Sequence, residues 1–63
     1  MTGGQMKTRR EKLGLTQARL AELIGVKENT VYRYESGKLA ISLTIELAFE
    51  RVEQKIKEQL AKL

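Results

Sequence analysis

The side chains with the clearest recognition chemistry lie between residues 28 and 36, in the segment ENTVYRYES. Arg33 carries a planar guanidinium that donates two parallel hydrogen bonds, and Asn29 carries a carboxamide that both donates and accepts. These groups match the edges of guanine and adenine, and Tyr32 offers apolar contact to a thymine methyl. The chemistry available here is hydrogen bonding to the edges of planar rings that carry donors and acceptors.

These side chains share one face if the segment is helical, since each residue of an α-helix advances by about 100°. Apolar spacing turns Val31 and Tyr34, with Glu35, toward the interior. The outermost positions are then Asn29, Arg33 and Ser36, with Tyr32 and Glu28 beside them.

Composition argues against catalysis, because the chain has no His and no Cys, and its 63 residues also lack Asp. Metal sites built on His or Cys, thiol nucleophiles, His-based triads and disulfides are therefore excluded. We expect a single domain that is not an enzyme, with no cofactor and no evident small-molecule substrate. No stretch has the pattern of a membrane span or a signal peptide, so a cytoplasmic location and no membrane partner are expected.

The positive charge is concentrated in the first part of the chain. Residues 1–38 contain eight basic residues against four glutamates, whereas residues 39–63 contain four of each. A basic surface binds phosphates by releasing condensed counterions, which supplies most non-specific affinity for nucleic acid. The alternative is an ordinary solvated basic face.

Two short amphipathic helices, 17–24 and 28–36, are predicted from apolar steps of three and four. Gly25 follows the first of them, where a left-handed residue ends a helix and turns the chain. Ala21 is a small residue that lets a second helix cross closely. The sequence predicts a helix-turn-helix, or else two packed helices of a small bundle.

The segment QARLAELIGVKENTVYRYESG, extended back through KTRREKLGLTQ, resembles the Cro and repressor family, also called the XRE family of bacterial and phage regulators. The resemblance covers roughly residues 5–41. It implies an all-α, lambda-repressor-like domain of about four helices that reads the major groove of duplex DNA with helix 28–36.

The resemblance also implies roles for single residues. Arg10 is expected to form an ion pair with Glu35 and so orient the first helix, predicted at 3–13. Base and edge readers are expected at Gln17, Asn29, Tyr32 and Arg33, and phosphate contacts at Thr16, Lys27 and Lys38.

Two residues depart from the family pattern. Lys27 stands where Ser or Thr often caps the reading helix, so about 1 kcal/mol of capping is expected to be missing. Glu28 brings a carboxylate near phosphates; it favours the helix dipole and can accept from cytosine N4, but it can equally repel DNA.

A long last helix is predicted at 43–61 behind Ser42 as N-cap, and it departs from the shorter helix usual in the family. Its first half is apolar on more than one side, so two buried faces are expected. The segment 42–63 is a possible dimerisation helix in a homodimer, with contacts at Phe49, Val52, Ile56 and Leu60; the alternative is a seam folded onto its own domain.

The sequence thus indicates a DNA-binding transcriptional regulator, most simply a repressor that occupies a promoter. An activator or an antitoxin has the same sequence features. The rival hypothesis is a protein-interaction module, similar to a coactivator, that docks through the apolar last helix.

Overall fold

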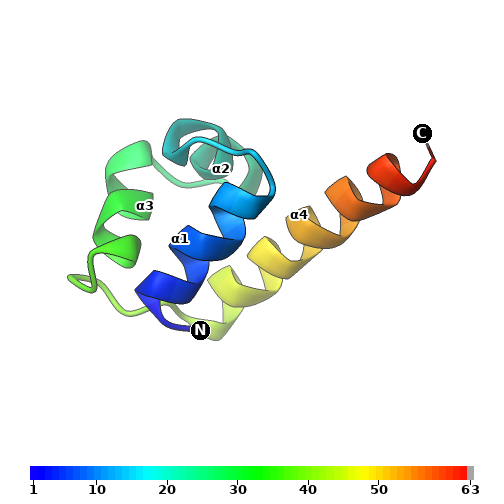
Figure 1. Cartoon of the computed structure of the whole chain (residues 1–63). Helices are drawn as coiled ribbons and strands as arrows, with labels where there is room; N and C mark the ends of the chain where they lie inside the picture. Colours follow the sequence, from blue (N-terminus) through cyan, green and yellow to red (C-terminus); the bar gives the residue numbers. More distant parts are fainter. Residues whose placement is uncertain (63) are drawn as a thin grey trace.

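The computed structural model describes residues 1–62 and contains four α-helices within them (Figure 1). Their bounds are α1 Gly3–Lys12, α2 Gln17–Ile24, α3 Glu28–Glu35 and α4 Leu43–Ala61. The all-α fold class is confirmed. The first and third helices end one residue earlier than the sequence indicated, and Leu63, the last residue of the segment 42–63, lies outside the described residues.

Side-chain caps explain where three of the helices begin. Thr2 and Gln5 form a reciprocal capping box at the start of α1, Thr16 accepts from the backbone N–H of Arg19, and Ser42 accepts from that of Ile45. Each cap satisfies a first-turn N–H that has no partner inside the helix. Gly25 ends α2 with φ of 77°, a left-handed conformation that favours glycine, and this turn directs the chain into α3.

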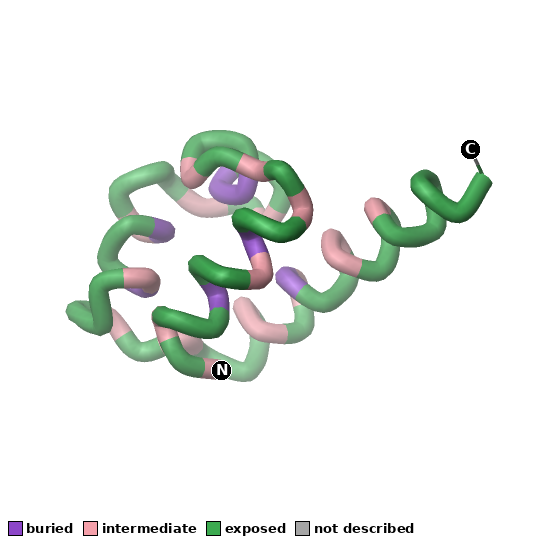
Figure 2. Tube along the Cα trace, in the orientation of Figure 1, coloured by how far each residue is buried: buried purple, intermediate pink, exposed green. Residues whose placement is uncertain are grey.

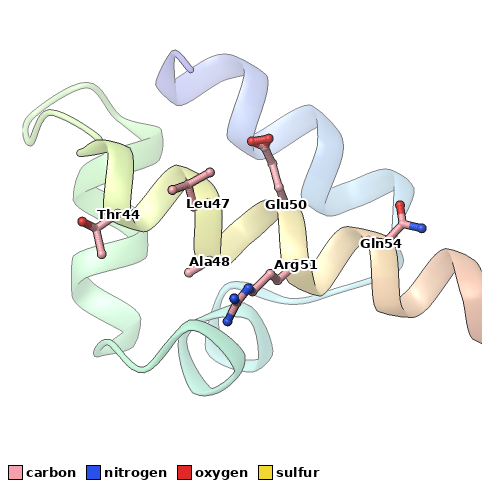
Figure 3. Close-up of a pocket in the computed structure, with 6 residues that line it drawn as sticks. All are labelled: Thr44, Leu47, Ala48, Glu50, Arg51 and Gln54. Atoms are coloured by element: carbon pink, nitrogen blue, oxygen red, sulfur yellow. The ribbon is translucent and has the colours of Figure 1, made fainter.

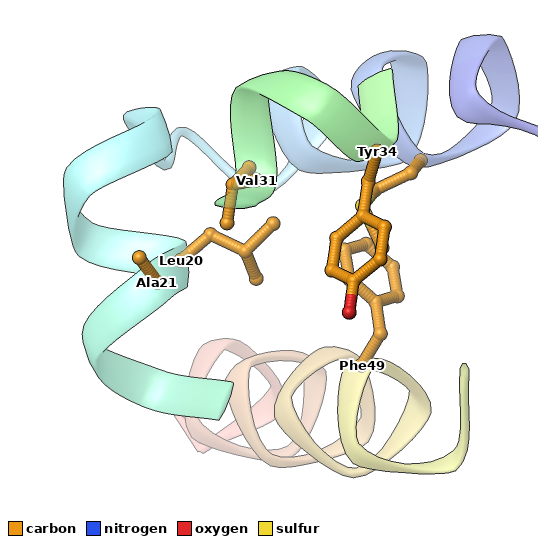
Figure 4. Close-up of a cluster of buried hydrophobic side chains, with 6 residues drawn as sticks. Leu20, Ala21, Val31, Tyr34 and Phe49 are labelled. Carbon is orange, nitrogen blue, oxygen red and sulfur yellow. The ribbon is translucent and has the colours of Figure 1, made fainter. Parts of the chain in front are cut away.

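The core lies where α1, α2, α3 and the first half of α4 meet (Figure 2). Six apolar residues are buried there: Met6, Leu20, Ala21, Val31, Tyr34 and Phe49. Leu20 and Val31 face each other between α2 and α3, and the ring of Tyr34 points toward α4 (Figure 4). The core therefore fixes which face of α3 is turned outward.

The beginning of α1 packs directly on the end of α3 at Gly3. A Cβ added at Gly3 would lie 2.8 Å from the carbonyl oxygen of Glu35 and closer still to that of Tyr34. A Cβ added at the neighbouring Gly4 would meet nothing within 4 Å. Glycine is thus required at Gly3 by a close approach of two backbones, and not at Gly4.

An ion pair joins α1 to α4. The Arg9 side chain donates two hydrogen bonds to the Glu53 carboxylate, with Nε 3.0 Å from Oε2. The guanidinium carbon of Arg9 also lies 5.2 Å from the centroid of the Phe49 ring. The hydrogen bond from Arg9 holds the pKa of Glu53 below its usual range. No pattern in the sequence indicated this contact.

The expectation of two buried faces on the first half of α4 is wrong for this single chain. Phe49 and Ile45 pack on the core, but Leu43 is 69% exposed and Leu47 is 53% exposed. Leu47 and Phe49 are separated by about 200° around the helix, so burying one turns the other to solvent. The outward face forms a shallow hollow lined by Thr44, Leu47, Ala48, Glu50, Arg51 and Gln54 (Figure 3).

Phe49 does not belong with the predicted dimerisation residues. It is fully buried in the core of its own chain, whereas Val52 and Ile56 are half-buried and Leu60 is 62% exposed. Eleven residues make about three helical turns, so Phe49 and Leu60 lie on one line. The body of the domain covers this line at Phe49 and no longer covers it at Leu60, because α4 projects beyond the other helices (Figure 1).

No helix within residues 1–62 is long and apolar enough to span a lipid bilayer.

Candidate nucleic-acid interface

The outward face of α3 carries the residues with recognition chemistry. Val31 is completely buried and Tyr34 is 8% exposed, which turns Asn29, Arg33 and Ser36 to solvent. Tyr32, 48% exposed, and Glu28, also exposed, lie beside them. Both Asn29 and Arg33 are exposed on this one face, one helical turn apart.

A hydrogen-bonded ion pair holds α3 against α1. Arg10 Nε lies 2.7 Å from Glu35 Oε2 and Arg10 Nη2 lies 3.1 Å from Oε1, while Nη1 donates to the carbonyl oxygen of Leu15. The side chains are only 10% and 3% exposed, so solvent screens the pair weakly. The hydrogen bond with Glu35 raises the pKa of Arg10. Arg10 and Glu35, named as partners from the sequence, are in contact.

The same carboxylate also positions Gln17 at the start of α2. Gln17 Nε2 donates to Glu35 Oε1 at 3.0 Å, so Glu35 accepts from both α1 and α2. This uses one of the two amide hydrogens of Gln17 and leaves the other hydrogen and the carbonyl oxygen for an external partner. Thr16 is exposed, and its hydroxyl oxygen accepts the capping hydrogen bond at 3.0 Å.

A small hollow of about 120 Å³ lies at the junction of α1, α2 and α3. It is lined by Lys7, Gln17, Tyr32, Glu35 and Ser36. Lys7 was missed from the sequence, where nothing distinguishes it from the other exposed lysines of the chain. Its position, one turn before Arg10, places it near α3 once the pair of Arg10 with Glu35 is recognised.

Lys38 approaches α3 from the turn that follows it. Its ammonium nitrogen lies 5.7 Å from the centroid of the Tyr32 ring, and its backbone N–H donates to the carbonyl oxygen of Arg33 at 2.9 Å. Lys27 is exposed at the opposite end of α3. In the described part of the chain its side chain makes no capping hydrogen bond, as its residue type led us to expect.

The charge on this surface differs from the count along the sequence. Arg9 and Arg10 face carboxylates of Glu53 and Glu35, so they do not contribute free positive charge to the outward face of α3. The exposed cations around that face are Lys7, Lys27, Arg33 and Lys38, opposed by Glu28. Across residues 1–62 no group of three or more His, Cys, Asp or Glu is placed to hold a metal ion.

The profile of the helix-turn-helix family matches residues 6–52, which include α2, α3, the turn between them and most of α1. The chain belongs to the helix-turn-helix family. This helix-turn-helix chain is also 35% identical over 50 residues to a Pyrococcus furiosus protein that is named as a candidate HTH-type transcriptional regulatory protein. The match covers 79% of this chain but 16% of the relative, and no solved structure matches.

Proposed function

We propose that this helix-turn-helix chain binds duplex DNA by placing α3 in the major groove, and that it regulates transcription as a repressor. The observation that carries the proposal is the outward face of α3, on which Asn29 and Arg33 lie exposed beside the exposed cations Lys7, Lys27 and Lys38. The family match and the regulatory name of the relative support the same function.

Each polar side chain of this surface has a role that follows from its chemistry. Arg33 donates two hydrogen bonds to guanine O6 and N7, and Asn29 pairs with adenine N6 and N7. Gln17, with one amide hydrogen already used, presents the remaining polar atoms to the DNA backbone or a base edge. Glu28 accepts from cytosine N4 and disfavours other bases at that position.

The cations around α3 act on the phosphates. Lys27 and Lys38 approach the backbone from the two ends of α3, and Lys7 approaches from α1. Thr16, whose hydroxyl oxygen accepts the cap, directs its own hydrogen to a phosphate. Such contacts fix orientation, and the base contacts supply the specificity. Repression then requires nothing beyond occupancy of a promoter.

We also propose a homodimer that forms through the second half of α4. A groove of about 320 Å³ runs between α2 and α4, and it is lined by four apolar residues, Leu15, Leu23, Val52 and Ile56, and by three polar ones, Arg19, Lys55 and Gln59. Leu60 is exposed and follows Ile56 by about one helical turn on α4. One face therefore carries both a partly apolar groove and an exposed leucine, and a two-fold interface joins such a patch to the same patch of a second copy. Two reading helices would then face half-sites about 34 Å apart.

The oligomeric state is tested by sedimentation equilibrium of the wild type, Leu60→Asp and Leu47→Asp. Leu47 is a matched control because it is also an exposed leucine of α4 but lies on the opposite face. We expect the wild type to be a dimer, Leu60→Asp a monomer and Leu47→Asp a dimer. A monomeric wild type whose mass is unchanged by Leu60→Asp refutes the dimer.

The DNA-binding function is tested by selecting bound duplexes from a random pool at physiological salt and sequencing them. We expect two inverted half-sites about one helical turn apart. Arg33→Ala should then weaken binding to the selected site by about 1–3 kcal/mol and relax the preference at one base pair. A folded chain that enriches no sequence contradicts sequence-specific regulation.

A protein-interaction module is the second candidate function, and the exposed Leu43 and Leu47 on the outer face of α4 favour it. An antitoxin that docks a partner protein on this face belongs to the same class. The discriminating measurement is the salt dependence of DNA affinity, which is steep when several phosphates are neutralised and absent in a protein that does not bind DNA.

A further inference from the structure

The side chains of Tyr32 and Lys38 form a unit that neither the fold nor the base-reading role accounts for. Lys38 Nζ lies 5.7 Å from the centroid of the Tyr32 ring. The backbone beneath the lysine is fixed, because the N–H groups of Lys38 and Leu39 both donate to the carbonyl oxygen of Arg33, at 2.9 and 3.2 Å. The turn at the end of α3 thus returns Lys38 to the helix face that carries Tyr32.

This arrangement does not favour base reading by Tyr32. A thymine methyl packs against a ring face or edge, and at one face of Tyr32 that place is shared with the Lys38 ammonium, 5.7 Å from the ring centroid. Tyr32 also lines the hollow that Lys7 and Gln17 line. Tyr32 thus lies at the side of α3, beside the line of Asn29, Arg33 and Ser36, with Lys38 on one face of its ring.

Lysine loses much rotamer freedom when it contacts a phosphate, because its ammonium sits on a flexible four-carbon stem. An aromatic face attracts the ammonium and restricts that stem before DNA arrives. Less conformational freedom then remains to be lost on binding, which is the general benefit of preorganisation.

We propose that Tyr32 is a positioning residue that holds the ammonium of Lys38 for a phosphate of the DNA backbone. The proposal rests on the proposed DNA-binding function, and it replaces base reading as the role of Tyr32. Its consequence is that Tyr32 contributes to affinity through Lys38 and contributes nothing to base preference.

A double-mutant cycle tests this coupling. The variants are Tyr32→Leu, Lys38→Met and their combination, with Tyr32→Phe as the control that keeps the aromatic face and removes the hydroxyl. Dissociation constants are measured on the selected duplex over a range of salt concentrations. Because Tyr32 is 48% exposed, the variants should keep the fold, which circular dichroism and the Tm verify.

We expect Tyr32→Phe to bind like the wild type and Tyr32→Leu to bind about two- to five-fold more weakly, the range of an exposed cation–π contact. Lys38→Met should reduce the salt slope by about 0.9, the value for one lost phosphate contact. In the Lys38→Met background, Tyr32→Leu should have no further effect. Independent losses that multiply in the double variant overturn the proposal, and so does a loss in Tyr32→Phe equal to that in Tyr32→Leu.

Replacing each thymine of the site by uracil removes one methyl at a time and tests base reading directly. A replacement that weakens the wild type but not Tyr32→Leu assigns Tyr32 to that methyl and overturns the positioning role. Failure of the wild type to bind any duplex refutes the proposed function itself and this role with it. Either failure is distinguishable from the other, since only the second abolishes binding by the wild type.

Discussion

The two glycines at the beginning of α1 should respond in opposite directions to the same substitution. Gly4→Ala adds a methyl in open space, and we expect it to stabilise the domain by about 0.5 kcal/mol, the low end for a helical glycine, since the position is in the first turn. Gly3→Ala places its methyl 2.8 Å from the carbonyl oxygen of Glu35, which belongs to backbone and cannot rotate away. Overpacking of this kind costs about 1–3 kcal/mol.

Thermal unfolding followed by circular dichroism separates the two variants. For a domain of this size 1 kcal/mol corresponds to about 4–8 °C, so the Tm values of Gly3→Ala and Gly4→Ala should differ by roughly 10 °C. Gly4→Ala is the matched control, because both substitutions change helix propensity in the same first turn. Equal Tm values for the two variants would refute the close packing of α1 on the end of α3.

Three further outcomes follow from the ion pairs and the exposed lysines. Arg10→Met leaves the Glu35 carboxylate, 3% exposed, without its cation and with the Gln17 amide as donor, and it should lower the free energy of unfolding in urea by about 3–5 kcal/mol. Partial recovery is expected when Glu35→Gln is added, and an unchanged Tm contradicts the role of the pair. Glu53→Gln should lower the free energy of unfolding by about 1 kcal/mol at pH 6 and by less near pH 3, because a carboxyl whose pKa is depressed by folding stabilises the fold above its unfolded pKa and loses that contribution as the pH falls through its folded pKa. A loss of stability that does not change with pH argues against the pair of Arg9 with Glu53. Lys7→Gln should weaken binding to all duplexes alike and reduce the slope of log affinity against log salt by about 0.9, whereas Lys57→Gln, on the projecting part of α4, should leave that slope unchanged. Equal slopes for the two variants would show that Lys7 does not contact a phosphate.

The parts of the fold that local sequence determines were predictable. The apolar steps of α2 and α3, with Gly25 between them, define two helices and their inner faces. Once Val31 and Tyr34 are inside, the rotation of 100° per residue places Asn29 and Arg33 outside. This face needed no knowledge of the rest of the chain.

The contacts that were missed depend on where distant segments meet. Arg9 and Glu53 are separated by 44 residues, and no local pattern distinguishes them from other surface charges. The apolar line of α4 was visible, but its division into a buried Phe49 and an exposed Leu60 depends on where the other helices end. In the candidate site, the hydrogen bond from Gln17 to Glu35 could not be predicted, because it depends on how closely α2 and α3 approach each other.

The projecting end of α4 has a consequence for how the chain exchanges its amide hydrogens. Helical hydrogen bonds near Phe49 open only when the core opens, whereas those of the last turns open by local fraying at little free-energy cost. Protection should therefore fall along α4 from Phe49 toward Leu60 in a dilute sample. A second copy seated on this end would slow exchange in the last turns as protein concentration rises, and the rates at the centre of α2 and α3 would report the stability of the whole domain.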